Sequence, residues 1–189
     1  MTQHYLRHIN IEQVIAQVPG LTDASLRAAL GQSADRLLKA APKWHLVTPV
    51  KSRDQALAQT RFFKSIIEHV DDQRKQSTFL ASMVTLLWAQ QQQNLPEYLS
   101  GLSSPIFKVA SSFKFQGSNL SIHELKGNNK DRVYLQTHTP KDQGGLQTVI
   151  LYLSHHKKDQ TTPSVVKDYC HTQASNYLNK QNSVVFLKD

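Results

Sequence analysis

The apolar run from Val149 to Leu153 constrains the fold of this chain more than any other feature of the sequence. A short run without polar residues predicts a buried strand, so other elements of the chain must cover it. The run leads into HHKK at residues 155–158, and Thr162-Pro163 then has the residue types that begin a helix. The sequence therefore predicts a buried strand whose end presents two imidazoles and two ammonium groups, a combination that suits an anionic partner.

The balance of charged residues bounds the class of partner. The 189 residues carry a formal net charge of +8, which favours a nucleic acid, an anionic surface or an acidic protein. A solvated basic surface that keeps the protein soluble would carry the same charge. The charge thus narrows the classes of partner without selecting one.

Several classes of site and location are excluded by what the sequence lacks. Cys170 is the only cysteine, so neither an internal disulfide nor a cysteine-based zinc cluster can form. No cluster of His, Asp and Glu has metal-ligand spacing, and no glycine-rich phosphate loop is present, so we expect no metal and no cofactor. The sequence has no signal-peptide core and no window that approaches about 18 apolar residues, so we expect a cytoplasmic protein without a membrane partner.

Residues 1–43 have the pattern of short helices separated by glycine. Apolar residues recur at helical spacing before Gly20, and Thr22 can cap a second helix that stops at Gly31. Residues 22–41 therefore have the rhythm of a helix-turn-helix, which would read DNA. The same pattern fits a helical extension that is structural or docks a partner, because helical hairpins with Leu and Ala inside are common. We expect residues 1–43 to be a helical extension of a domain over 44–189.

Residues 44–189 have the pattern of an α+β domain. A strand over 44–50 is followed by two amphipathic helices that Asp71-Asp72 separates. Further strands are predicted over 113–115, 120–125, 132–137 and 149–153, then a helix from Pro163, and finally either an edge strand or a frayed tail over 183–187. Helices followed by a run of strands predict an antiparallel sheet of three to four strands with helices packed on one face.

Two stretches of this domain resemble a known family. The sequences IHELKGNNKDRVYLQT and VILYLSHHKKDQTTPSVVKDY are similar to the C-terminal half of RelE/ParE-superfamily toxins, especially the HigB-like, phage-derived branch. The resemblance covers about residues 44–178. The chain differs from that family at His155, where an aromatic residue is usual, and in the longer loop over 138–145, and residues 1–43 have no counterpart in a minimal toxin.

The resemblance implies both a fold and an activity. It implies a RelE-like fold and the toxin of a type II toxin-antitoxin system, which cleaves messenger RNA on the ribosome without a metal and has a cognate antitoxin as its partner. Such cleavage needs proton transfers and neutralisation of the charge that develops on phosphorus. Histidine suits the first task because its reference pKa is about 6.5, and lysine and arginine suit the second. The candidate catalytic residues are His155, His156, Lys158 and Arg132, and the candidate RNA-binding residues are Lys126, Lys130, Tyr134 and Lys157.

Alternatives to a nuclease remain at this point. Because consecutive residues of a strand point to opposite faces, at most one of His155 and His156 should reach a shared site. All the basic residues of 155–158 could also simply be solvated at a strand end. A relative without nuclease activity would inhibit a protein target such as gyrase or another host factor, and a DNA-binding regulator would act through residues 22–41.

Overall fold

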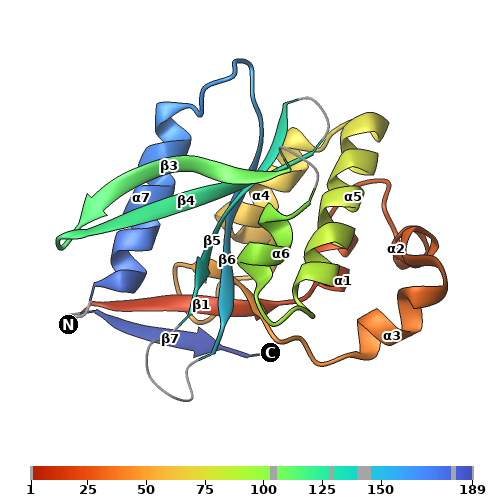
Figure 1. Ribbon diagram of the computed structural model, residues 1–189, viewed down its shortest axis with the longest axis horizontal. Coiled ribbons are helices and arrows are strands. Elements are labelled where there is room, and N and C mark those ends of the chain that lie inside the picture. The colour runs from red at the N-terminus through yellow and green to blue at the C-terminus, as the bar shows by residue number, and fades with distance from the viewer. Residues whose placement is uncertain (1, 103–105, 128–129, 140–145, 180–181, 189) are drawn as a thin grey trace.

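The computed structural model describes residues 2–102, 106–127, 130–139, 146–179 and 182–188, and its described strands form one seven-stranded mixed sheet (Figure 1). The strands in sheet order are β3 (Phe107–Phe115), β4 (Ser118–Lys126), β5 (Asp131–His138), β6 (Thr148–His156), β2 (His45–Val50), β1 (Gln3–Ile9) and β7 (Ser183–Leu187). Strands β3 to β6 form an antiparallel meander, β1 is antiparallel to β2, and the pairs β2–β6 and β1–β7 are parallel. The protein is therefore an α+β protein with a larger sheet than its sequence predicts.

The predicted RelE-like sheet of three to four antiparallel strands is wrong. The predicted meander is present, but β1 and β7 extend the sheet beyond β2, and two of the strand pairs are parallel. The first element of the predicted helical extension is also a strand, because residues 3–9 pair with β2 on one side and with β7 on the other. Leu6 and Ile9 are the buried residues of β1, and two buried apolar positions give too weak a pattern to reveal a strand locally.

The described helices lie on both faces of the sheet rather than on one. Six helices contribute to a single large core on one face: α1 (Ile11–Ala16), α2 (Asp23–Leu30), α3 (Ala34–Lys39), α4 (Arg61–His69), α5 (Gln73–Ala89) and α6 (Leu95–Ser100). Helix α7 (Ser164–Leu178) alone packs on the other face, where Val166, Cys170 and Ala174 meet Tyr152 and Ile150 of the sheet (Figure 1). Short 3-10 turns over 31–33 and 57–59 precede α3 and α4.

The predicted helical hairpin in residues 22–41 is present as α2 and α3, and it belongs to the main core. Thr22 caps α2 in a reciprocal pair with Ser25, and Gly31 has a positive φ of 57° that ends the helix. Leu26 and Leu37 are buried in the same cluster as α5. Residues 1–43 and residues 44–189 therefore share one sheet and one core.

The sheet opens between β2 and β6, and α4 fills the opening. Strand β2 pairs with β6 at three positions, from His45–Thr148 to Val47–Ile150, whereas β6 continues along β5 to His156. Beyond the opening, the backbone N–H of Ser154 donates to Oγ of Ser65 on α4 at 2.8 Å. This contact satisfies a buried strand donor that β2 no longer reaches, and it fixes α4 beside the end of β6.

Within these described ranges, no helix has both the length and the apolar character that crossing a membrane requires.

Candidate functional site

An open cleft lies where β5 begins and β6 ends, next to the start of α5. Asp131 and His156 are register partners at this end of the two strands, and Nδ1 of His156 lies 2.6 Å from Oδ1 of Asp131. The cleft has a volume of about 480 Å³, and its lining is polar and charged: Asp72, Arg74, Lys75, Lys130, Asp131 and His156. With 36% of its side chain exposed, His156 is accessible to a ligand in this cleft.

The carboxylate of Asp131 determines which nitrogen of His156 is left to accept a proton. If Nδ1–H donates to Asp131, then Nε2 carries the lone pair and can accept a proton. A carboxylate in this position orients the ring and stabilises the imidazolium that forms when the ring accepts a proton. The pair is therefore arranged as a general base and its orienting group.

His155 makes a different contact, with the last residue of α4. Its Nδ1 lies 3.3 Å from Nε2 of His69, and the two ring centroids are 4.6 Å apart. Burial lowers the pKa of both imidazoles, and the charge of His69 further lowers the pKa of His155. Both rings are therefore neutral at pH 7, with one donating a hydrogen bond to the other.

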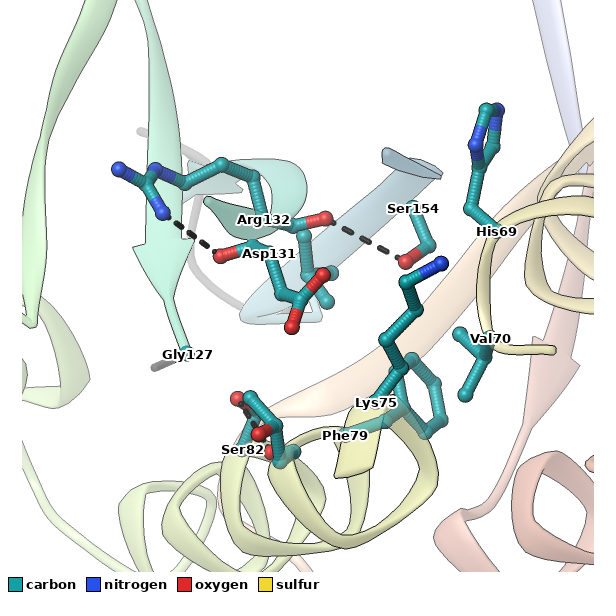
Figure 2. Close-up of a pocket in the computed structure, with 11 residues that line it drawn as sticks. His69, Val70, Lys75, Phe79, Ser82, Gly127, Asp131, Arg132 and Ser154 are labelled. Atoms are coloured by element: carbon teal, nitrogen blue, oxygen red, sulfur yellow. Dashed lines mark hydrogen bonds between the residues drawn. The ribbon is translucent and has the colours of Figure 1, made fainter. Parts of the chain in front are cut away.

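The start of α5 supplies two cations to the cleft. Nζ of Lys75 lies 2.7 Å from the carboxylate of Asp71, and this hydrogen bond raises the pKa of Lys75. Asp72 caps the helix by accepting from the backbone N–H of Lys75 at 2.8 Å. Figure 2 shows the side chains of Lys75 and Asp131 reaching into the same small cavity between α5 and β5. The charges of Arg74 and Lys75 are thus held on the side of the cleft that faces Asp131.

Lys130 also lines the cleft, Lys158 follows the end of β6, and both are exposed. Nζ of Lys130 donates to the backbone carbonyl of Lys158 at 2.6 Å, which holds the two residues next to each other. The half-buried Lys126 lies at the end of β4, where its register partner is Arg132. Of the predicted basic residues, Lys130 and Lys158 are therefore the two that share an exposed position next to His156.

Three predicted site residues are buried, and two of them pair with the acid Glu124. Glu124 is fully buried on β4, and its carboxylate lies 3.2 Å from Nε of Arg132 and 2.8 Å from Nζ of Lys157. Lys108 completes the cluster at 3.3 Å. Burial by itself would raise the pKa of Glu124, but Lys157, Arg132 and Lys108 outweigh it and leave the pKa lowered. Glu124 is therefore an internal anion that holds cations from three strands or strand ends.

This burial corrects the roles expected of Arg132, Lys157 and Tyr134. Arg132 is 8% exposed and Lys157 is 2% exposed, and both are paired with Glu124. In Figure 2 the side chain of Arg132 extends away from the cavity that Lys75 and Asp131 enter. Tyr134 is 0% exposed and packs against α7, so it offers no ring face on which a base could stack. In this structure these three side chains contact other parts of the protein.

Sequence reasoning missed Asp131, His69 and the cations of α5. Asp131 had a usable signal, because two antiparallel strands joined by a long loop place the first residue of one opposite the last residue of the other. His69 had none, because its contact with His155 depends on the position of α4 in the opened sheet. The only sequence signal for Arg74 and Lys75 is their position after Asp71-Asp72. That position predicts the start of a helix but not which residues lie next to it.

Comparison with protein-family models, with curated proteins and with solved structures finds no match to this chain. In the part of the chain that the structure describes, no group of three or more His, Cys, Asp and Glu side chains is arranged to hold a metal ion.

Proposed function

We propose that this protein is an endoribonuclease that cleaves RNA by attack of a 2′-hydroxyl on the neighbouring phosphate, with His156 as the general base. The observation that carries the proposal is the 2.6 Å contact between His156 and Asp131 at the wall of an open, polar cleft. Nε2 of His156 takes the proton of the 2′-hydroxyl, and Asp131 stabilises the resulting imidazolium. No step of this mechanism uses a metal ion.

The reaction that we propose is a transesterification. The bond between the 2′-oxygen and phosphorus forms while the bond from phosphorus to the 5′-oxygen breaks, which leaves a cyclic 2′,3′-phosphate and a 5′-hydroxyl. The departing 5′-oxygen takes its proton from solvent, which the open cleft admits. Arg74, Lys75 and Lys130 line the cleft and would neutralise the negative charge that develops on the phosphate oxygens.

The biological setting of the proposal rests on the sequence alone: the substrate and the partner come from the resemblance, and the location comes from the lack of a signal-peptide core and of a long apolar window. The setting consists of messenger RNA on the ribosome as substrate, a cognate antitoxin as partner, and the cytoplasm as location. The corrected fold supports none of these three points, whereas the cleft chemistry does not depend on them. We therefore separate the two parts, and we propose RNA cleavage as the activity and a toxin-antitoxin system as its context.

The alternative of DNA reading through residues 22–41 has no observation in its favour. Arg27 forms ion pairs with Asp23 and Asp35 at 2.8 and 3.1 Å. The guanidinium of Arg36 lies 5.2 Å from the ring centroid of Trp88. The arginines of this helical hairpin thus have contacts within the protein, and its second helix, α3, has only six residues.

The test is induced expression of the wild type and of His156→Asn, with growth followed in culture and cleavage mapped by primer extension on total messenger RNA. The matched control is His138→Asn, because His138 lies at the opposite end of β5. We expect the wild type and the control to arrest growth with discrete cleavages, and His156→Asn to lose both.

The same comparison with purified protein and a single-stranded RNA, in the presence of EDTA, separates the activity from the cellular context. Growth arrest without cleavage would replace the nuclease proposal by inhibition of a protein target. Absence of cleavage by folded wild-type protein in both assays would overturn the proposal.

A further inference from the structure

A second cleft lies at the opposite end of α4, between the end of β2 and α7. It has a volume of about 560 Å³, within the range of small-molecule sites. Its walls are the end of β2 and the loop that follows it, the start of β1, the first turn of α4 and one face of α7. The lining residues that matter here are Lys51, Arg61, Lys64, Tyr169, Gln173 and Tyr177.

The charge in this cleft is of one sign. Lys51, Arg61 and Lys64 are among its lining residues, and none of the described lining residues is an acid. Among the described residues, none of these three cations has an ion pair. All three are exposed. A hollow lined by unpaired cations concentrates positive potential and attracts an anion.

Hydrogen bonds and a cation–π contact join the elements that form the walls of the cleft. The backbone N–H of Lys51 donates to the side chain of Gln55 at 2.6 Å, and Gln55 donates onward to the carbonyl of Gln59 at 3.0 Å. These bonds tie the loop after β2 to the start of α4. The guanidinium of Arg61 lies 5.9 Å from the ring centroid of Tyr169 on α7, which links the two helices across the cleft.

Helix α7 contributes aromatic and amide groups from one face. Tyr169, Gln173 and Tyr177 follow at spacings of four residues, so they lie on the same side of the helix. Burial raises the pKa of Tyr169 and Tyr177, so both hydroxyls stay protonated. The cleft therefore offers flat aromatic surface and neutral hydrogen-bonding groups next to its cations, which is the mixture that a nucleoside phosphate requires.

The two clefts are separate sites. Arg61 begins α4 and His69 ends it, which puts their backbones about 12 Å apart along the helix. None of the residues that line this cleft also lines the cleft of His156. Residues of α7 line this cleft, whereas residues at the start of α5 line the cleft of His156.

We propose that the cleft between α4 and α7 binds a nucleoside phosphate, with Arg61, Lys64 and Lys51 holding the phosphate and Tyr169 contacting the base. Arg61 is the main phosphate ligand because its planar fork matches two phosphate oxygens. The proposal is independent of RNA cleavage at His156 and is tested by binding alone.

The experiment is isothermal titration calorimetry on the full chain with adenosine monophosphate, adenosine and inorganic phosphate as probes. We expect the monophosphate to bind with one-to-one stoichiometry and more tightly than either adenosine or phosphate. In Arg61→Gln/Lys64→Gln, the affinity should fall by about tenfold or more because two charge-assisted contacts are lost. Lys114→Ala on β3 removes an exposed cation elsewhere and should leave the affinity unchanged.

Two further variants decide between the clefts. His156→Asn should bind the monophosphate as the wild type does, and Lys51→Gln/Lys64→Gln should weaken binding while it leaves the contact between Arg61 and Tyr169 intact. Loss of binding in His156→Asn together with unchanged binding in both cleft variants would place the nucleotide at the other site and overturn the proposal. Absence of binding to the wild type, or equal binding of phosphate and monophosphate, would also overturn it.

Discussion

Glu124 joins cations from three segments of the chain, although its own side chain is fully buried. We expect Glu124→Gln to lower the free energy of unfolding by about 3–5 kcal/mol, because it removes the carboxylate charge that the buried Arg132 and Lys157 face. The measurement is urea unfolding at pH 7. Lys108→Gln is the matched control: Lys108 is 49% exposed, so the loss should stay below about 1 kcal/mol. Equal losses in the two variants would contradict the role of Glu124 as a buried anchor.

Asp131 is expected to act through His156 rather than on the substrate itself. Asp131→Asn should reduce kcat for RNA cleavage by about 10²–10⁴-fold, because the amide no longer stabilises the imidazolium or selects the tautomer with a free Nε2. KM should change little, since the cations of the cleft are retained. The check is single-turnover cleavage of a short RNA by folded variant protein. A rise in KM without loss of kcat would instead make Asp131 a residue for substrate binding.

The candidate site could be predicted only in part from the sequence. The basic end of β6 was visible, because an apolar strand that runs into HHKK must present those residues near its end. The different roles of these residues could not be predicted, because each role depends on a partner from another element. The partners are Asp131 for His156, His69 for His155 and Glu124 for Lys157. The buried carboxylate of Glu124 pairs with two of the predicted site residues, Arg132 and Lys157. No local sequence pattern predicts such a pairing.

At the scale of elements, α4 packs beside β6 and supplies a hydrogen-bond partner to its edge. Ser65 is 1% exposed, and its Oγ accepts the hydrogen bond from the backbone N–H of Ser154. We expect Ser65→Ala to lower the free energy of unfolding by about 1–3 kcal/mol, because that buried donor loses its partner. Hydrogen exchange at the amide of Ser154 should become faster in the same variant.

Ser77→Ala on α5 is the control for this change. Ser65 donates to the backbone carbonyl of Phe62 in its own helix at 2.6 Å, and Ser77 likewise donates to that of Gln73 at 2.9 Å, but Ser77 is exposed. Its replacement should change the free energy of unfolding by less than about 0.5 kcal/mol. If Ser65→Ala behaved in the same way, α4 would not depend on β6 for its position.

Elements with a strong local period were predictable, and those defined by distant pairing were not. The strands at 120–125, 132–137 and 149–153 lie within β4, β5 and β6, and the amphipathic patterns around Phe62 and Phe79 correspond to α4 and α5. Strand β1 was missed because it is defined by its pairing with β2 and β7, and β7 lies at the other end of the sequence. Parallel pairing of the first and last strands has no signature in a window of ten residues.

At the scale of the whole molecule, histidine burial links stability to pH. Burial lowers the pKa of seven histidines: His8, His45, His69, His123, His138, His155 and His171. The unfolded chain takes up protons near the reference pKa of about 6.5, while the folded protein binds them only at lower pH. Between these values the unfolded state holds more protons, so the free energy of unfolding falls as the pH falls. We expect the urea midpoint to decrease steadily from about pH 7.5 to about pH 5.

The contribution of one pair to this slope can be isolated. In His69→Asn/His155→Asn, two of the groups that resist protonation are absent, so the urea midpoint should fall less steeply over the same range at constant ionic strength. Glu124 does not confound the test, because its lowered pKa stabilises the fold above the reference value of 4.5 and its effect is lost only at lower pH. A midpoint that rose on acidification would mean that the folded protein binds protons more strongly than the unfolded chain, which is the opposite of what the lowered pKa of these histidines predicts. An unchanged slope in the double variant would assign the dependence to the other histidines, which lie on β1, β2, β4, β5 and α7, rather than to the contact between α4 and β6.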